Sequence, residues 1–213
     1  MNTLSFGILC FSSLFTVIDP IATAPVFASM TRNETHAAAR RIAIRACLVA
    51  LGVLLLFAVS GAFVFRLFGI TIDAFRIGGG IVFLAVGLPM LTGNGHEPEV
   101  KDPRKDPSVV PLGVPLIGGP GAITTVMVLM GQSTTALEVA VLLVALFAAM
   151  IATCALLVVS PFITRRLGPA GLELVTKVMG LIILVIGIQF IINGIRPVAL
   201  DILRAARGSA SLQ

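Results

Sequence analysis

Charged residues divide this chain into long apolar windows. Apart from Asp19, no Asp, Glu, Lys or Arg occurs in six windows, residues 1–31, 46–65, 77–96, 107–137, 139–164 and 178–195. A transmembrane helix needs about 20 predominantly apolar residues. The pattern therefore predicts an all-α membrane protein with six spans, near residues 4–28, 44–65, 74–92, 111–131, 137–160 and 174–195.

The composition supports a membrane protein. Hydrophobic residues make up 57% of the chain and charged residues 12%, with a mean hydropathy of +1.07. Soluble domains average about 25% charged residues, so the charges here are too few to cover a soluble surface. The N-terminus has no basic region and no small-residue cleavage site, so we expect the first span to remain in the mature protein. The three cysteines show no disulfide or metal spacing, and we interpret them as reduced packing residues.

The net charge of +5 has a topological explanation and does not indicate binding to nucleic acid. Cytoplasmic loops of membrane proteins are enriched in Lys and Arg. If the N-terminus is outside, the inner loops hold ten of the 15 basic residues and the outer loops and tail hold five. This asymmetry predicts a multi-pass protein, surrounded by membrane lipid, with both termini outside the cytoplasm.

The predicted hydrophilic loop 93–109 divides the chain into two similar halves, 1–92 and 110–196, followed by a tail, 197–213. The segment "VIDPIATAPV" at 17–26 aligns with "IGGPGAITTV" at 117–126, and Gly80 and Gly87 align with Gly180 and Gly187 at the same offset. Each half has three spans, so the second half enters the membrane from the opposite side. The sequence therefore predicts two inverted three-helix repeats, a common plan in secondary transporters.

Prolines interrupt the first and fourth spans at corresponding places. Pro20 and Pro25 lie in the first span, and "GGPG" at 118–121 lies in the fourth. Each proline removes a backbone donor, and such breaks are tolerated in a membrane only where the backbone faces protein or a watery cavity. Paired breaks point to a substrate site, whose exposed N–H and C=O ends suit a zwitterion. The predicted substrate-binding residues are Asp19, Pro20, Thr23, Gly118, Gly119, Gly121, Thr124, Thr125 and Gln189, with no catalytic or metal-binding residue.

Two polar features keep more than one interpretation. Asp19 could cap the half-helix that starts at Pro20, contact a substrate amine or a coupling cation, or carry a proton. Its counterpart at an offset of 100 is Gly119, so the site is asymmetric in charge. Gln189 and Asn193 lie four apart on one helix face, where they either line the cavity or form interhelical hydrogen bonds.

Three motifs together resemble the MarC family of six-span inner-membrane proteins, which is similar to the LysE-type exporters. They are "DPIATAPVF", "AFRIGGGIVF" and "VPLIGGPGAITTVMVL", at residues 19–27, 74–83 and 114–129. Ala22 stands where the family often has glycine. The family includes transporters of small neutral amino acids such as glycine and alanine, so the resemblance implies that activity in the inner membrane.

The leading hypothesis is therefore a secondary transporter that works by alternating access at the broken first and fourth spans. It would use a proton or sodium ion for coupling and no other cofactor, since no "GxxxxGK[ST]" loop for ATP occurs. An enzyme is not expected, because no second carboxylate lies deep in a span and neither "HExxH" nor "GxSxG" occurs. The alternatives are a non-transporting assembly or sensor subunit, with the glycine-rich spans as contacts in a homo-oligomer, and a small-molecule or drug efflux protein.

Overall fold

The computed structural model describes residues 2–32, 34–92, 108–164 and 168–210 of the 213-residue chain. These residues form seven α-helices and one π-helix, and no strand occurs among them. The elements are α1 (Thr3–Ile18), α2 (Pro20–Met30), α3 (His36–Leu67), α4 (Ile72–Thr92), η1 (Ser108–Ile117), α5 (Pro120–Gln132), α6 (Ala136–Thr164) and α7 (Gly168–Ala210).

Five predicted spans correspond to helical segments that are long and apolar enough to cross a membrane. They are Thr3–Met30, His36–Leu67, Ile72–Thr92, Ala136–Phe162 and Glu173–Leu200. The predicted span 111–131 is not one helix: it is divided between η1 and α5, which have 10 and 13 residues and are each too short to cross alone. The segment Thr3–Met30 is itself divided at Asp19 into α1 and α2.

Two other predicted boundaries lie elsewhere. Most of the predicted loop 93–109 is outside the described residues, and η1 already begins at Ser108. The predicted tail from residue 197 continues the last span, because α7 runs without interruption to Ala210.

Threonine side chains start three of the long helices. Thr35 Oγ1 accepts from Ala38 N–H at the start of α3 (3.2 Å), and Thr71 Oγ1 accepts from Ala74 N–H at the start of α4 (3.0 Å). At the start of α6, Thr135 and Glu138 each accept a hydrogen bond from the other's backbone N–H, both 3.2 Å. This reciprocal pattern is a capping box, and it satisfies N–H groups that have no acceptor within the helix.

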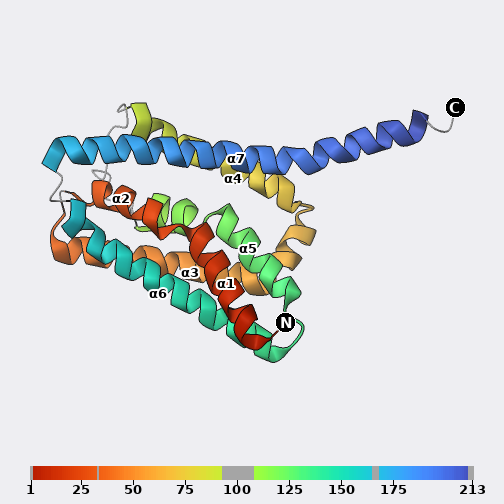
Figure 1. Ribbon diagram of the computed structural model, residues 1–213, viewed down its shortest axis with the longest axis horizontal. Coiled ribbons are helices and arrows are strands. Elements are labelled where there is room, and N and C mark those ends of the chain that lie inside the picture. Colours follow the sequence, from red (N-terminus) through yellow and green to blue (C-terminus); the bar gives the residue numbers. More distant parts are fainter. Residues whose placement is uncertain (1, 33, 93–107, 165–167, 211–213) are drawn as a thin grey trace.

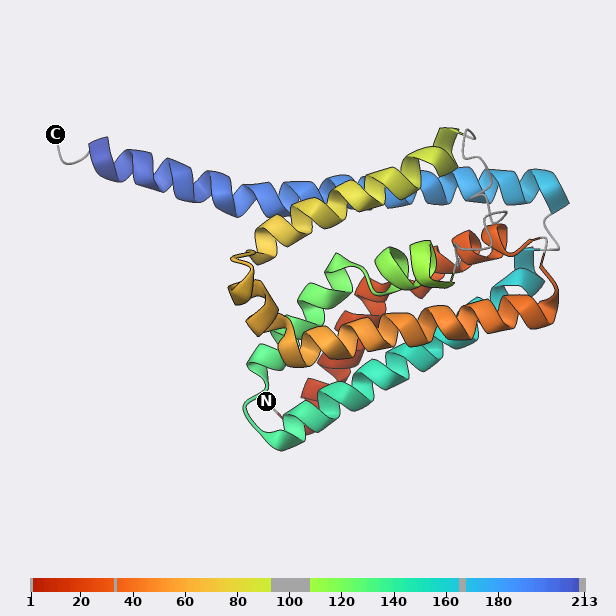
Figure 2. The ribbon, with the colours of Figure 1, turned by 180° about the vertical axis from the view of Figure 1, so that it is seen from behind.

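The helices form a pair and a bundle. In Figures 1 and 2, α4 lies along α7 on one side of the molecule, and α1, α2, α3, η1, α5 and α6 lie together on the other. Within the bundle, α1 and α2 pack against α6, and α3 packs against η1, α5 and α6. The pair contacts the bundle through α2, η1 and α5.

Small residues allow α4 and α7 to approach closely. A Cβ atom on Gly80 would lie 2.5 Å from the Gly187 carbonyl oxygen, and one on Gly87 would lie 2.8 Å from the Gly180 carbonyl oxygen. Carbon atoms normally approach other atoms to about 3.5–4.0 Å. The two backbones are therefore in direct contact at two levels, and this contact requires glycine at these positions.

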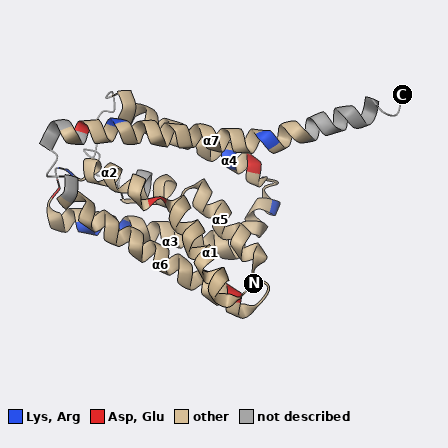
Figure 3. Ribbon diagram, viewed as in Figure 1, with Lys and Arg blue, Asp and Glu red and all other residues tan. Residues whose placement is uncertain are grey.

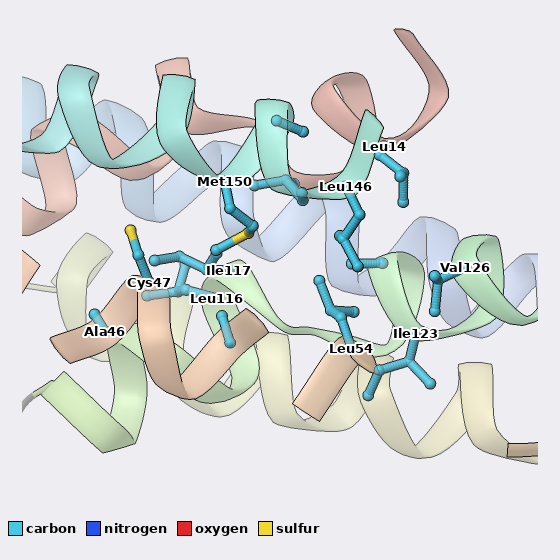
Figure 4. Close-up of a cluster of buried hydrophobic side chains, with 14 of the residues drawn as sticks. Leu14, Ala46, Cys47, Leu54, Leu116, Ile117, Ile123, Val126, Leu146 and Met150 are labelled. Carbon is cyan, nitrogen blue, oxygen red and sulfur yellow. The ribbon is translucent and has the colours of Figure 1, made fainter. Parts of the chain in front are cut away.

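Apolar side chains fill the bundle and also cover its outside. Figure 4 shows Leu54, Ile117, Leu146 and Met150 among side chains that point toward one another between α3, η1, α5 and α6. Large apolar side chains are exposed on the outer surface, among them Val59, which is 80% exposed. Figure 3 shows charged residues mainly near the helix ends, with one acidic residue at the junction of α1 and α2. An apolar belt between charged ends is the surface that a lipid bilayer requires.

Candidate functional site

The first break is built around the backbone of Asp19. Its φ of 46° and ψ of 65° are left-handed, and within the described residues it is the only non-glycine residue with positive φ. Aspartate tolerates this conformation better than most residues. Its N–H donates to the Phe15 carbonyl at 3.1 Å and closes α1, while its Oδ1 accepts from Ala22 N–H at 3.2 Å and starts α2. Pro20, in the first turn of α2, has no N–H that needs a partner.

The carbonyl oxygen of Asp19 is also fully engaged. Thr23 donates to it twice, from its backbone N–H at 3.0 Å and from its Oγ1 at 2.9 Å. The capping role considered for Asp19 is therefore present in the structure. Its Oδ2 accepts no hydrogen bond within the described part of the chain, which leaves one carboxylate oxygen for a ligand.

The second break lies between η1 and α5. The Gly118 N–H donates to the Gly113 carbonyl at 2.9 Å, an i to i+5 bond that closes the wide turn of the π-helix. Gly119 is extended (φ −74°, ψ 176°) and precedes Pro120, which starts α5. A Cβ atom on Gly119 would collide with the Pro115 carbonyl oxygen. The chain can fold back on itself here only because residue 119 has no side chain.

The two breaks face each other across a small cavity of about 50 Å³. The cavity lies where the α4–α7 pair meets the bundle. Both helix junctions contribute to it, together with aromatic and aliphatic side chains from the pair. The lining residues are Val17, Ile18, Asp19, Ala22, Thr23, Phe83, Leu116, Gly119, Gly121, Ala122, Ile183, Ile186 and Phe190.

Helix ends give this apolar cavity its polarity. Ile18 ends α1, and the carbonyls of its last turn after Phe15 accept no hydrogen bond from an N–H of their own helix, so they favour a cation. Gly121 and Ala122 lie in the first turn of α5, whose N–H groups favour an anion. The Asp19 carboxylate adds a negative group on the α1 side. The cavity can therefore receive a positive group on one side and a negative group on the other.

A larger cleft of about 380 Å³ adjoins the cavity. Val17, Gly121 and Phe190 line both spaces and so form the wall between them. Phe190 also packs on Phe83, with ring centroids 5.8 Å apart. The complete lining of the cleft is Val17, Arg76, Gly121, Thr124, Thr125, Phe190, Asn193, Arg196 and Pro197.

The structure places the predicted site residues in three groups. Asp19, Thr23, Gly119 and Gly121 line the cavity. Thr124 and Thr125 line the cleft, together with Gly121. The remaining three line neither space: Pro20 and Gly118 are buried at the breaks, and Gln189 is exposed.

Gln189 takes part in a local hydrogen bond. Its Nε2 donates to Asn193 Oδ1 at 2.8 Å, one turn further along α7. Neither the cavity-lining nor the interhelical interpretation therefore describes Gln189 in this structure. Asn193, in contrast, lines the cleft.

Sequence reasoning did not identify the apolar walls of the cavity. Phe83, Ile183, Ile186 and Phe190 resemble the other apolar residues of their spans, so nothing in the sequence distinguishes them. Arg76 and Arg196 could have been considered together, because each lies near the predicted outer end of its span.

Comparison with known proteins bears out the resemblance noted from the motifs. A model of the "MarC family integral membrane protein" matches residues 4–199. A UPF0056 membrane protein of Methanocaldococcus jannaschii is 38% identical over 92% of this chain and 89% of its own length. YhcE of Escherichia coli is 34% identical over 88% and 91%, and YvbG of Bacillus subtilis is 33% identical over 90% and 95%. These relatives are described as membrane proteins, without a substrate. No solved structure matches the chain significantly.

Proposed function

The chain belongs to the MarC family of integral membrane proteins, and we propose that it is a secondary transporter of small neutral amino acids such as glycine and alanine. The observation that carries this proposal is the cavity between the two helix breaks. Nine of its 13 lining residues belong to segments that are long and apolar enough to cross a membrane, and the other four belong to η1, α5 and the junction between them. It also offers opposite polar groups at close range, as a zwitterion requires.

The cavity suggests how such a substrate would bind. The ammonium group would contact Asp19 Oδ2 and the carbonyl end of α1. The carboxylate would lie at the N-terminus of α5, near Gly121 and Ala122. A methyl group, as in alanine, would face the apolar side chains of Ile183 and Ile186.

The volume of the cavity favours the smallest substrates. A water-sized group needs roughly 10–15 Å³ of such volume, so about 50 Å³ admits roughly three to five non-hydrogen atoms. Glycine and alanine lie at or just above this limit. A typical drug site is roughly 300–1,000 Å³, so this cavity gives little support to drug efflux.

Two features support an arrangement of six spans as inverted repeats, with η1 and α5 together forming the fourth. First, the breaks at Asp19 and Gly119 are 100 residues apart. Second, Gly80 contacts Gly187, and Gly87 contacts Gly180. Residues 180 and 187 are the counterparts of residues 80 and 87 at the same offset of 100. Each glycine of α4 therefore contacts the counterpart of the other, which is the pattern that a pseudo-two-fold axis between α4 and α7 produces.

Alternating access would move the α4–α7 pair against the bundle. The cavity lies between these two units, and the open cleft lies on only one side of it. The proposal places the protein in the cell inner membrane with both termini outside the cytoplasm, so the cleft would face outward. A proton or sodium ion would couple transport, and the proposal includes no cofactor and no enzymatic step.

The test is uptake of radiolabelled glycine and alanine into liposomes that contain the purified protein, with imposed proton and sodium gradients. We expect gradient-driven uptake. Asp19→Asn keeps the cap, because Asn caps a helix about as well as Asp, so loss of the gradient dependence in this variant would assign Asp19 to coupling. Glu138→Gln is the matched control, since Gln also completes a capping box and Glu138 does not line the cavity. Absence of uptake by folded protein under every gradient would reject the proposal and favour a non-transporting assembly or sensor subunit.

A further inference from the structure

Two arginines line the open cleft that adjoins the cavity. Arg76 comes from α4 and Arg196 from α7, and none of the described residues that line the cleft is acidic. Their helices meet at this level, because a Cβ atom on Gly194 would lie 2.6 Å from the Asp73 carbonyl oxygen. We propose that this cleft is an anion-binding site that takes a carboxylate or a phosphate group.

The two arginines differ in how far they are already neutralised. Arg76 Nη1 lies 3.2 Å from Asp73 Oδ1, one helical turn away, so part of its charge is paired. Arg196 has no ion pair or hydrogen bond within the described residues. The exposed Arg196 guanidinium is therefore available to bind an anion.

Neutral donors extend the site beyond the arginines. Asn193 Oδ1 is occupied by Gln189 Nε2, so the Nδ2 group of Asn193 is the part left to donate. Thr125 also lines the cleft, and its hydroxyl forms no hydrogen bond within the described residues. The Arg196 guanidinium, the Asn193 amide and the Thr125 hydroxyl therefore surround one space with donors, and no carboxylate occurs among the described lining residues.

The planar guanidinium group of arginine binds two oxygens of a carboxylate or phosphate group through two parallel hydrogen bonds, and the neutral donors add further hydrogen bonds. The volume of about 380 Å³ admits more than the anionic group itself. Two sources share this chemistry: the carboxylate of a soluble solute, and the phosphate of a lipid headgroup from the surrounding membrane. The first source rests on the proposed transport. In that case the cleft is an outer substrate position and the cavity an inner one, and Val17, Gly121 and Phe190, which line both spaces, separate them.

The test measures how fast phenylglyoxal modifies Arg196, followed by mass spectrometry of the full-length protein in phosphatidylcholine nanodiscs. Sodium acetate and inorganic phosphate are compared with sodium chloride at equal ionic strength. At about ten times Kd, an occupied site should slow modification roughly tenfold, because only unliganded protein reacts. Arg66 is the internal reference, since it is exposed on α3 and does not line the cleft.

A second arm distinguishes the sources. Protection of Arg196 by acetate or inorganic phosphate in phosphatidylcholine indicates a soluble anion. Protection only after phosphatidylglycerol is added indicates the phosphate of an anionic lipid, because the phosphatidylcholine phosphate is balanced by its own choline group. Arg196→Gln should remove the protection of Arg76 by the same anion, and Arg66→Gln should leave it unchanged. Unprotected Arg196 under all conditions, or equal protection of Arg66, would overturn the proposal.

This outcome is independent of transport. If the wild-type protein takes up no glycine or alanine but Arg196 is protected, the proposed transport fails and the anion site stands. If uptake occurs and Arg196 is never protected, the transport proposal stands and the anion site fails.

Discussion

Replacing Gly80 with alanine is expected to force α4 and α7 apart. The added Cβ would lie 2.5 Å from the Gly187 carbonyl oxygen, 2.6 Å from Ile191 Cγ1 and 3.1 Å from the Ile191 nitrogen. Two of these three atoms belong to the backbone of α7, so no rotation of a side chain relieves the contact. Normal contact distances of about 3.5–4.0 Å require the helices to separate by roughly 1 Å at this level.

The neighbouring Gly78 provides a matched control. It lies in the same helix, two residues earlier, and its added Cβ would meet nothing within 4 Å. Both substitutions gain the same helix propensity, about 1 kcal/mol. The difference between Gly78→Ala and Gly80→Ala therefore isolates overpacking, which costs about 1–3 kcal/mol.

The assay is thermal unfolding in detergent, followed with a thiol-reactive dye. The chain has no Trp and no Tyr, whereas Cys10 and Cys47 are buried and would react only on unfolding. In a chain of this size 1 kcal/mol shifts Tm by about 2–4 °C, so Gly80→Ala should unfold about 2–12 °C below Gly78→Ala. Equal Tm values for the two variants would refute the direct backbone contact between α4 and α7.

Three further predictions concern the breaks and the bundle. Asp19→Ala should lower the free energy of unfolding by about 2 kcal/mol, because it removes a helix cap and places alanine in a left-handed conformation. Asp19→Asn should lie within about 0.5 kcal/mol of wild type. Equal stability of the two variants in the dye assay would contradict the capping geometry. Gly119→Ala should lower Tm and abolish uptake, because its Cβ has no space beside the Pro115 carbonyl. Gly131→Ala in α5 is the control, because its Cβ would meet no atom within 4 Å, and it should preserve both the Tm and the uptake. A Gly119→Ala variant that still transports would argue against a fixed second break. Cys47 in α3 and Cys154 in α6 neighbour each other, so oxidation with a membrane-permeant oxidant should join their peptides. Detection of only free thiols by mass spectrometry would count against this packing of α3 on α6.

The position of the breaks could be read from the sequence because it depends on local backbone chemistry. Pro20 and Pro120 cannot donate a helical hydrogen bond, and Asp19 and Gly119 accept the backbone conformations that a helix start requires. Five of the six spans predicted from the apolar windows are helical segments of spanning length, since hydropathy and length are properties of the chain itself. The fourth window is different, because its prolines favour the wide turns of η1 over a continuous α-helix.

Other features depended on contacts between residues far apart in the chain. Phe83 and Phe190 form walls of the cavity, although nothing in their own segments marks them. The polarity of Gln189 predicts a place in the cavity lining, yet its side chain is exposed, because the contact of α7 with α4 sets the rotation of α7. Polarity alone does not give the direction of a side chain on a helix that has polar residues on more than one face.

The three consecutive glycines 78–80 show most directly what the sequence determines and what the tertiary structure decides. They are identical residues, and in the sequence they predict only a place where helices can approach closely. In the folded chain Gly78 faces open space, Gly79 contacts Pro120 at the second break, and Gly80 contacts Gly187 of α7. The sequence by itself determined that this is a helical membrane protein with two interrupted spans, because hydropathy, charge and proline act within one segment. The tertiary structure decided which residues enclose the cavity and the cleft. Successive side chains on a helix point about 100° apart, and the packing of neighbouring helices determines which of these directions faces a cavity, another helix or the surface.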